Sequence, residues 1–367
     1  MGLNKNQQAL LELVKAGLWA QPIQGSKFKI QGSIDWEKVY QLAKEQAVVG
    51  LLAAGMENLN DNLTVNIPLA LKLQIIGVAL QIEQRNKEMN SFIADIVEKM
   101  RQADVYTLLV KGQGIAQCYE KPLWRTSGDI DFFLSSDNYN KAKSFFIPLS
   151  SGGKPERQFS KEWGMNIGSW YVELHGTQRT GLSTMVDEVV DGVQRTVFND
   201  GKVRSTEFQV SGSKVQVFLP AADEDVFFVF THFIKHFYKE GGVSIRQLCD
   251  WCRLLWKYRD SLDSGLLESR IRKAGLMAEW RAFAKLAVDY LGMPVEAMPL
   301  FDLNADLDLN KKKAEKILTF ILKGGEWRRF KDTVAVGRIF PLNTLRFAPG
   351  ILFSVTWLKV KERCFKH

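Results

Sequence analysis

Cysteine and histidine are scarce in this sequence, with four of each among 367 residues. Cys249 and Cys252 form a CxxC, a spacing found in redox and zinc sites. However, apolar residues recur at helical spacing around them and no second ligand pair accompanies them, so we expect free buried thiols. His232 and His236 are spaced like a zinc pair, but the sequence has no HExxH and no evident third ligand. For these two we expect packing or substrate contacts.

Long hydrophobic runs are also missing. No run reaches the roughly 18 apolar residues of a membrane helix, and the first residues lack the pattern of a signal peptide. We therefore expect a cytoplasmic protein without a transmembrane segment. The glycines near residue 112 fit neither the GxxxxGKS/T loop nor the GxGxxG fingerprint, which argues against P-loop and Rossmann sites.

Positive charge is concentrated near the C-terminus. The net charge is +8, yet residues 310–367 alone hold fourteen basic and four acidic residues, a net +10. Such a section attracts polyanions such as RNA or an anionic membrane surface; a solvated basic face without a ligand is the alternative. Residues 325–332, "GEWRRFKD", could stack on nucleic-acid bases, or could be a solvated helix end.

Hydrophobic periodicity divides the chain into three sections. Apolar residues recur every three or four positions in the first section and again in the last, which indicates helices. Between them lie short segments rich in β-branched and aromatic residues, which indicate strands. We predict an α/β (α+β) fold in which a small mixed-sheet core, 101–220, is flanked by helical sections, 1–100 and 221–367.

Individual elements follow from the same patterns. Residues 35–56, 67–103 and 266–292 each read as one helix, and 115–119 and 138–146 as short helices. The predicted strands are 105–110, 130–134, 165–176, 201–210 and 214–219.

Two aspartates stand where a buried strand is expected, in "GDIDFFL". On a strand, Asp129 and Asp131 share one face about 6.5 Å apart, while Ile130 and Phe132 point to the core. Two carboxylates at this spacing can bind one divalent cation, or two cations about 4 Å apart. The alternative is a strand that leaves a turn with both acids solvated.

A second strand offers a third acid. In "WYVELH" the alternation places Glu173 and His175 on the face opposite the apolar side chains. We expect His175 to be a hydrogen-bonded neighbour of the site and not a ligand. Oxygen ligands without a matched Cys/His set favour Mg²⁺ or Mn²⁺ over zinc. Upstream, Lys111 and its neighbouring glycines follow an apolar strand and could face a phosphate.

The stretch "KGQGIAQCYEKPLWRTSGDIDFFL" resembles the nucleotide-binding signature of the DNA polymerase β-like nucleotidyltransferase superfamily. It is most similar to a branch of bacterial proteins usually called uncharacterised nucleotidyltransferases, and the resemblance extends over residues 35–255. It implies that Asp129, Asp131 and Glu173 bind metal and are catalytic. It also implies nucleotide-binding positions at Lys111, Gly112, Gln113, Gly114, Arg125, Ser127 and Gly128.

Two departures from the superfamily pattern concern the site. The common Gly-Ser pair is here Lys111-Gly112, and the third acid is Glu173 where Asp is commoner. The resemblance implies transfer of a nucleoside monophosphate from an NTP to an acceptor hydroxyl, with Mg²⁺ or Mn²⁺ and release of pyrophosphate. The acceptor could be a small molecule, a protein or RNA. The alternatives are an inactive nucleotide-binding scaffold of the same fold and a tRNA-modifying, toxin-like enzyme.

Overall fold

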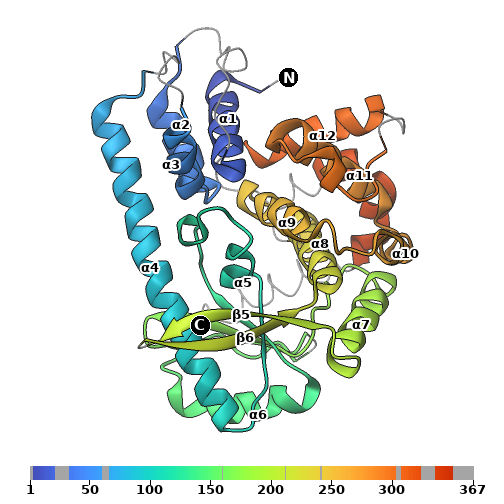
Figure 1. The fold of residues 1–367 in the computed structure, drawn as a ribbon. Helices are drawn as coiled ribbons and strands as arrows, with labels where there is room; N and C mark the ends of the chain where they lie inside the picture. Colours follow the sequence, from blue (N-terminus) through green and yellow to red (C-terminus); the bar gives the residue numbers. More distant parts are fainter. Residues whose placement is uncertain are drawn as a thin grey trace, which may run out of the picture.

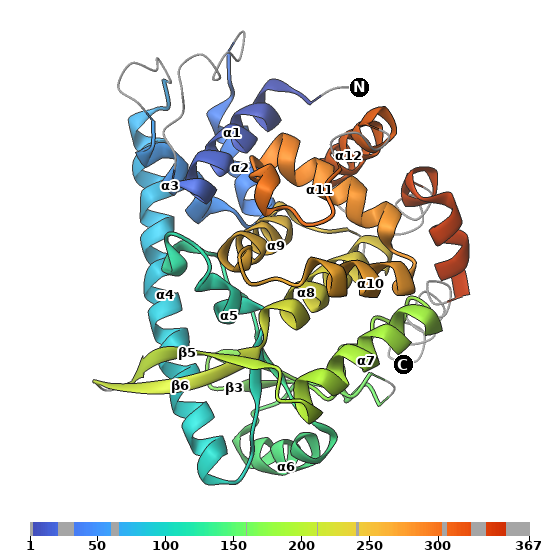
Figure 2. The same ribbon diagram turned by 45° about the vertical axis from the view of Figure 1, so that its right-hand side comes forward.

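The computed structural model describes residues 3–20, 33–59, 66–158, 160–210, 212–239, 242–302, 307–323 and 335–349. A small sheet and a β-hairpin lie at one end of the molecule, and helices from both ends of the chain lie at the other (Figures 1 and 2). This arrangement is the predicted α+β class, with a mixed sheet whose strands lie between two helical sections in the sequence.

In the described residues of the N-terminal section there are four helices, and the long one runs down one edge of the molecule (Figure 1). They are α1 (Lys5–Trp19), α2 (Trp36–Glu45), α3 (Val49–Glu57) and α4 (Leu69–Gln102). Helices α1 and α3 pack with their backbones almost in contact, because glycines stand at the crossing. A Cβ atom at Gly55 would overlap the carbonyl oxygen of Leu13, and one at Gly17 would overlap that of Leu51.

The single helix predicted over 35–56 is wrong, because the structure breaks it into α2 and α3. Ala47 has a φ of 55°, which ends the helical path. The side chain of Gln46 is buried at this corner, where it donates to the carbonyl of Ile321 and accepts from the N–H of Ile245. Contacts with distant helices therefore stabilise a break that local periodicity does not reveal.

The sheet has four strands in the order β1-β2-β4-β3. Strand β2 is antiparallel to β1 and parallel to β4, and β3 is antiparallel to β4. The strands are β1 (Leu108–Val110), β2 (Ile130–Phe133), β3 (Glu162–Ile167) and β4 (Trp170–His175). The strand predicted over 165–176 is thus a hairpin, since Gly168 turns the chain with a φ of 57°.

Short helices connect and cover the sheet. They are α5 (Gly112–Ala116), the 3₁₀ turns η1 (Pro122–Trp124) and η2 (Ile147–Leu149), α6 (Ser136–Phe146) and α7 (Thr184–Asn199). The sequence analysis did not identify α7. A second antiparallel pair, β5 (Val203–Val210) and β6 (Ser213–Pro220), packs against β1 and α4.

One face of the sheet closes a hydrophobic cluster. Ile130 and Phe132 of β2 and Val172 and Leu174 of β4 pack there with α6, the hairpin and the C-terminal half of α4. The alternation predicted for both strands is confirmed on this face. The neighbouring residues of β2 and β4 consequently point to the opposite face.

The C-terminal section is helical throughout its described part. It comprises α8 (Ala222–Lys239), α9 (Ile245–Tyr258), α10 (Ser264–Ala274), α11 (Met277–Leu291), η3 (Val295–Ala297), α12 (Leu307–Ile321) and helical residues within 335–349. The helix predicted over 266–292 is wrong, because Gly275 adopts φ 68° and separates α10 from α11.

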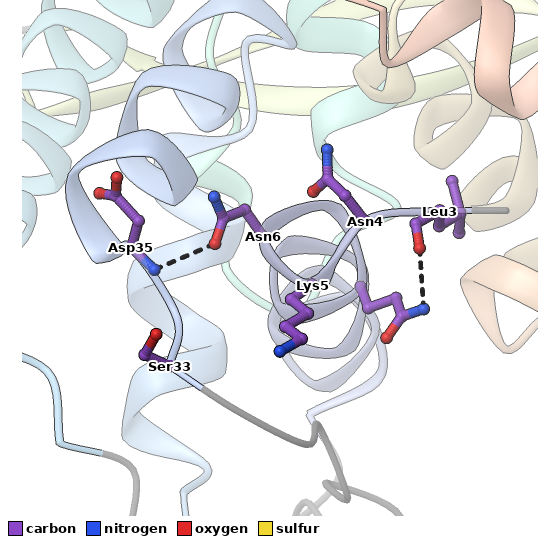
Figure 3. A pocket seen from close by; sticks show the side chains of 7 residues that line it. Leu3, Asn4, Lys5, Asn6, Ser33 and Asp35 are labelled. Atoms are coloured by element: carbon purple, nitrogen blue, oxygen red, sulfur yellow. Dashed lines mark hydrogen bonds between the residues drawn. The ribbon is translucent and has the colours of Figure 1, made fainter. Parts of the chain in front are cut away.

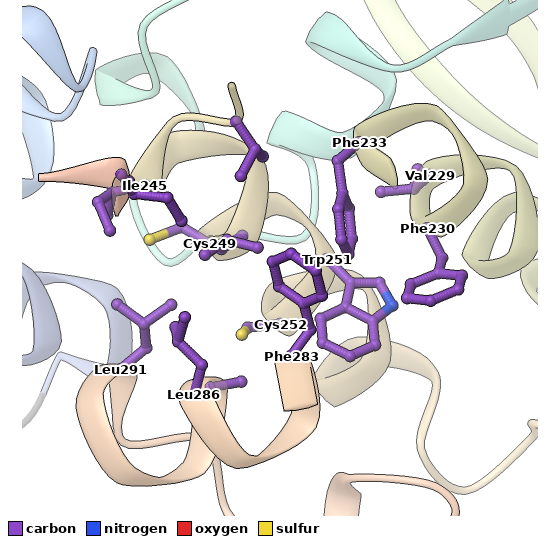
Figure 4. Packing of buried hydrophobic residues seen from close by; sticks show 14 of the residues in the cluster. Val229, Phe230, Phe233, Ile245, Cys249, Trp251, Cys252, Phe283, Leu286 and Leu291 are labelled. Carbon is purple, nitrogen blue, oxygen red and sulfur yellow. The ribbon is translucent and has the colours of Figure 1, made fainter. Parts of the chain in front are cut away.

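A second, larger hydrophobic cluster joins the N-terminal and C-terminal helices. Its centre is aromatic: Trp251 packs against Phe230 and Phe233, and Phe233 packs against Phe283 (Figure 4). Cys249 and Cys252 are free and buried among these side chains (Figure 4). Burial raises the pKa of the Cys249 thiol. The expected buried thiols are therefore found.

Three further features concern membrane-spanning helices, the basic C-terminal section and a pocket beside α1. Within the described residues, no helix has both the length and the apolar character that crossing a membrane requires. The basic section is described for α12 and within 335–349, whereas residues 325–332 and 350–367 lie outside the described residues. A pocket beside the start of α1 is lined by residues of α1 and by Ser33 and Asp35 (Figure 3). It contains none of the predicted site residues.

The α1–α3 crossing gives a testable expectation. We expect Gly55→Ala to lower the free energy of unfolding by about 1–3 kcal/mol, because the added methyl group overlaps the backbone of α1. Gly77→Ala on α4 is the matched control, since no atom lies within 4 Å of its Cβ position. There the substitution should raise stability by about 0.5–1 kcal/mol through helix propensity. Urea denaturation monitored by circular dichroism measures both; equal effects would contradict the close crossing.

Candidate functional site

Strand pairing brings the acids of β2 and β4 together on the polar face of the sheet. Asp131 is directly opposite Glu173 in the parallel ladder, and His175 follows Glu173 by two residues on the same face. On the other side of β2, Val110 is the partner of Asp131, so Lys111 follows β1 beside the same carboxylate. Four polar side chains, from β2, from β4 and from the residue that follows β1, therefore converge.

Distances define the centre of this group. Nε2 of His175 lies 2.7 Å from Oδ1 of Asp131 and 3.6 Å from Oε2 of Glu173. The ammonium of Lys111 donates to the same Oδ1 at 3.1 Å. One ligand atom from each of Asp131, Glu173 and His175 falls within 4.8 Å of the others, so the three residues could hold a cation.

The backbone around Lys111 is strained. Lys111 has φ 56° and ψ −148°, a region that residues other than glycine rarely occupy, at a cost of about 1–3 kcal/mol. Gly112 continues with a φ of 36° and starts α5. Strain of this kind persists where surrounding contacts impose it. Here it accompanies the Lys111–Asp131 ion pair, whose side chains are 17% and 4% exposed.

Asp129 lies at the margin of the group. With Gly128 it is exposed, in the segment just before β2, and it is not one of the three residues whose ligand atoms converge. The charge of Asp131, followed by burial, raises the pKa of Asp129, whereas Lys111 lowers it. Asp129 is therefore electrostatically coupled to the centre.

The carboxylates do not share the same protonation behaviour. Burial, then the charges of Asp131 and Asp129, raise the pKa of Glu173 to about 7. Burial would also raise the pKa of Asp131, but Lys111 and His175 outweigh it and hold that pKa well below its usual range. Burial and Lys111 lower the pKa of His175. Near neutral pH the centre thus combines an ionised Asp131 with a neutral imidazole.

Comparison with known proteins assigns the chain to a family. Residues 32–292 match the family model described as "Uncharacterised nucleotidyltransferase". The chain belongs to this nucleotidyltransferase family. The match spans β1 to β4 and every residue of the convergent group, and it makes the protein an enzyme of the nucleotidyltransferase class.

Solved structures and curated proteins add little to this assignment. The chain is similar to the "antigenic nucleotidyltransferase-like protein from Paracoccidioides brasiliensis" at 12% identity and a TM-score of 0.32, covering 56% of this chain and 93% of that chain. A search of curated proteins finds no match.

Two further predicted nucleotide-binding residues of the nucleotidyltransferase lie in a network that links α4 to the segment before β2. The buried amide of Gln113 donates to Oδ1 of Asn86 at 2.7 Å and to Oγ of Ser127 at 2.8 Å. Asn86 in turn donates to the carbonyls of Leu123 and Arg125. Gly114 is buried beside this network, where a Cβ atom would meet Leu219 of β6.

The predicted nucleotide-binding residue Arg125 forms a bidentate ion pair. Its Nε and Nη2 each donate at 2.7 Å to a carboxylate oxygen of Asp250 on α9, and both side chains are buried. Tyr119 donates to the same carboxylate at 2.7 Å. Two of the donors of Arg125 are therefore committed to α9, while its Nη1 donates to Ser127.

Sequence reasoning missed the contribution of α9, whereas on α8 it singled out His232 and His236 for packing or substrate contacts. Asp250 was not singled out, although an acid on an otherwise apolar helix face is a signal for a buried partner. Arg246, one turn earlier, donates to the carbonyl of Thr126, and its charge lowers the pKa of Asp129. On α8, His232 also lies near the centre, since burial and then the charge of Lys111 lower its pKa.

The Arg125–Asp250 pair provides a stability prediction. Arg125→Met removes the bidentate partner of the buried Asp250 carboxylate and leaves Arg246 as its nearby positive charge, so we expect a loss of about 3–5 kcal/mol in the free energy of unfolding. Adding Asp250→Leu should recover much of that loss, because the unpaired charge disappears. Lys214→Met is the control; its ion pair with Glu207 is exposed and should contribute less than about 1 kcal/mol. Unchanged stability of Arg125→Met in urea denaturation would contradict a structural role.

The raised pKa of Glu173 provides a pH prediction for the metal-free protein. Between its ordinary value of 4.5 and about 7, the folded state holds a proton that the unfolded state releases, so stability falls as pH rises. Glu173→Gln removes this effect. With chelator present, the free energy of unfolding of the variant minus that of the wild type should increase by about 2–3 kcal/mol from pH 4.5 to pH 8. Urea denaturation at both pH values tests this, and a pH-independent difference would refute it.

Proposed function

We propose that the protein transfers a nucleoside monophosphate from a nucleoside triphosphate to an acceptor hydroxyl, with release of pyrophosphate and dependence on Mg²⁺ or Mn²⁺. The observation on which this rests is the pairing of Asp131 and Glu173 across parallel strands, beside Asp129 and Lys111. Family membership supplies the reaction class.

The donor set suits a divalent cation. Asp131 and Glu173 crowd one face of the sheet with Asp129 just before it, and the pKa of Glu173, about 7, reflects burial and the charges of the two aspartates. Lys111 offsets only part of this negative charge. Asp131 and Glu173 would hold the ion, with Asp129 adjacent. When bound, such an ion neutralises phosphate charge and lowers the pKa of an acceptor hydroxyl.

The remaining residues are assigned by position. Lys111 is the cation nearest the carboxylates, so we assign it to the triphosphate as a point charge. Gly112 and Gly128 flank the carboxylates without bulky side chains. Gln113, Arg125 and Ser127 hold the segment before β2 in place through Asn86 and Asp250. We propose that this segment and α5 form the nucleotide-binding loop.

The acceptor is proposed on charge alone. α12 and residues 335–349 include several lysines and arginines of the basic section, which favours an anionic acceptor such as an RNA end over a neutral small molecule or protein hydroxyl. The supply of nucleoside triphosphates that the reaction consumes favours a cytoplasmic location. The section boundaries 1–100, 101–220 and 221–367 remain our proposed division of the chain.

Isotope transfer tests the proposal. Each α-³²P nucleoside triphosphate is incubated with the protein, Mg²⁺ or Mn²⁺, and separate fractions of cell RNA, protein and small molecules. We expect label in one acceptor fraction, and a loss of at least ~100-fold in Asp131→Asn, because even groups that only orient a metal ligand are worth about 10- to 100-fold.

Asp95→Asn is the matched control, since its ion pair with Lys99 lies on the surface of α4. It should transfer label like the wild type. Circular dichroism and thermal unfolding establish that both variants are folded. Retained transfer by a folded Asp131→Asn variant would sink the proposal. If the wild type transfers no label, and its affinity for nucleotide is the same with and without the metal ion, a catalytically inactive nucleotide-binding scaffold would be favoured.

A further inference from the structure

One nitrogen of the His175 imidazole lies close to two carboxyl groups, those of Asp131 and Glu173. The side chain is buried, with 7% of the residue exposed, and Nε2 faces both carboxylates. Asp131 already has a cationic partner in Lys111, whose ammonium lies 3.1 Å from the same oxygen. Lys111 thus supplies a positive charge at Asp131, and the neutral imidazole of His175 adds a hydrogen bond to the same oxygen.

The spacing of the three ligand atoms suits a single ion. Donor atoms that bind one metal at about 2.1 Å lie roughly 3 Å apart when they occupy adjacent positions. The Nε2 atom of His175 is 2.7 Å from Asp131 Oδ1 and 3.6 Å from Glu173 Oε2, which brackets that separation. Small side-chain movements would bring all three atoms to one ion.

The arrangement follows from strand geometry. Glu173 and His175 are two residues apart on β4, so their side chains leave the same face. The parallel ladder then sets Asp131 opposite Glu173 and Phe133 opposite His175. The three donor residues therefore all lie within two strands of the sheet, which fix the positions of two oxygen donors and one nitrogen donor.

We propose that His175 is a direct metal ligand with Asp131 and Glu173, and that this two-oxygen, one-nitrogen set makes the site prefer Mn²⁺ to Mg²⁺. The inference rests on the proposed function and deepens it by naming a nitrogen ligand and the order of affinity for the two proposed ions. Mg²⁺ requires oxygen donors, whereas Mn²⁺ is the first member of the transition-metal series whose affinity extends to nitrogen donors.

Binding of the ion has a consequence for Lys111. A dication at Asp131 and the ammonium of Lys111 compete for the same carboxylate oxygen. The ion therefore weakens the ion pair that holds Lys111 in the metal-free protein and leaves its ammonium available to an incoming triphosphate. For His175, ligation through Nε2 places the imidazole proton on Nδ1.

Electron paramagnetic resonance with Mn²⁺ alone tests the proposal on the full chain, without nucleotide. Continuous-wave spectra count free Mn²⁺ and give its affinity, and pulsed spectra detect coupling to a directly bound ¹⁴N nucleus. We expect ¹⁴N coupling in the wild type. Growth with ¹⁵N-histidine should replace it with ¹⁵N coupling, a result that requires no variant to fold.

Variants identify the histidine. His175→Gln keeps an amide N–H for Asp131 but has no imidazole, so it should lose the nitrogen coupling and bind Mn²⁺ at least ~10-fold more weakly. Its affinity for Mg²⁺, measured by competition, should change by less than about 3-fold. His236→Gln is the matched control on α8 and should keep the coupling. A role limited to orienting Asp131 predicts that His175→Gln binds Mn²⁺ like the wild type.

Several results would overturn the inference: no stoichiometric Mn²⁺ binding, bound Mn²⁺ without nitrogen coupling in the wild type, or coupling that persists in His175→Gln and disappears in His232→Gln. None of them decides the proposed function, which depends on label transfer with either ion. Label transfer without nitrogen coupling would support the proposed transfer activity and contradict His175 as a metal ligand. Nitrogen coupling without label transfer would support His175 as a ligand and contradict the proposed activity.

Discussion

The structure around the site depends on one electrostatic constraint, the crowding of Asp131 and Glu173 on one face of a small sheet, with Asp129 immediately before β2. The parallel register of β2 and β4 places Asp131 opposite Glu173, and no backbone adjustment can separate them without breaking the ladder. The protein limits the repulsion in two ways. Lys111 provides a positive charge at Asp131, and Glu173 has a pKa near 7, so it is only partly ionised at neutral pH.

Elements far apart in the sequence maintain this arrangement. The segment that leads into β2 is held on one side by α4, through Asn86, and on the other by α9, through the Arg125–Asp250 ion pair. Helices α5, α8 and α9 lie next to one another in both views of the molecule (Figures 1 and 2). The larger hydrophobic cluster then joins α9 to the N-terminal helices. The geometry of Asp129 and Asp131 is therefore coupled to the packing of both helical sections.

Local patterns were sufficient to predict the strand residues of β2 and β4 and the orientation of their side chains. The alternation in "IDFF" and "WYVELH" correctly separated the core face from the acidic face, since it depends only on strand periodicity. Non-local contacts were not predictable. The parallel pairing of β2 with β4, the buried partner of Arg125 and the break at Gln46 each involve residues that meet only after folding. Helix α7 was missed for another reason, because Ser183 as a helix cap and valines at helical spacing do predict a helix there from local sequence alone.

Charge also bears on the order of binding at the site. With all three carboxyl groups ionised, Lys111 leaves a net charge of about −2 at the centre, which repels a triphosphate. A divalent cation bound by Asp131 and Glu173, as proposed, would cancel that charge. Binding of the ion before the nucleotide would therefore be the electrostatically favourable order.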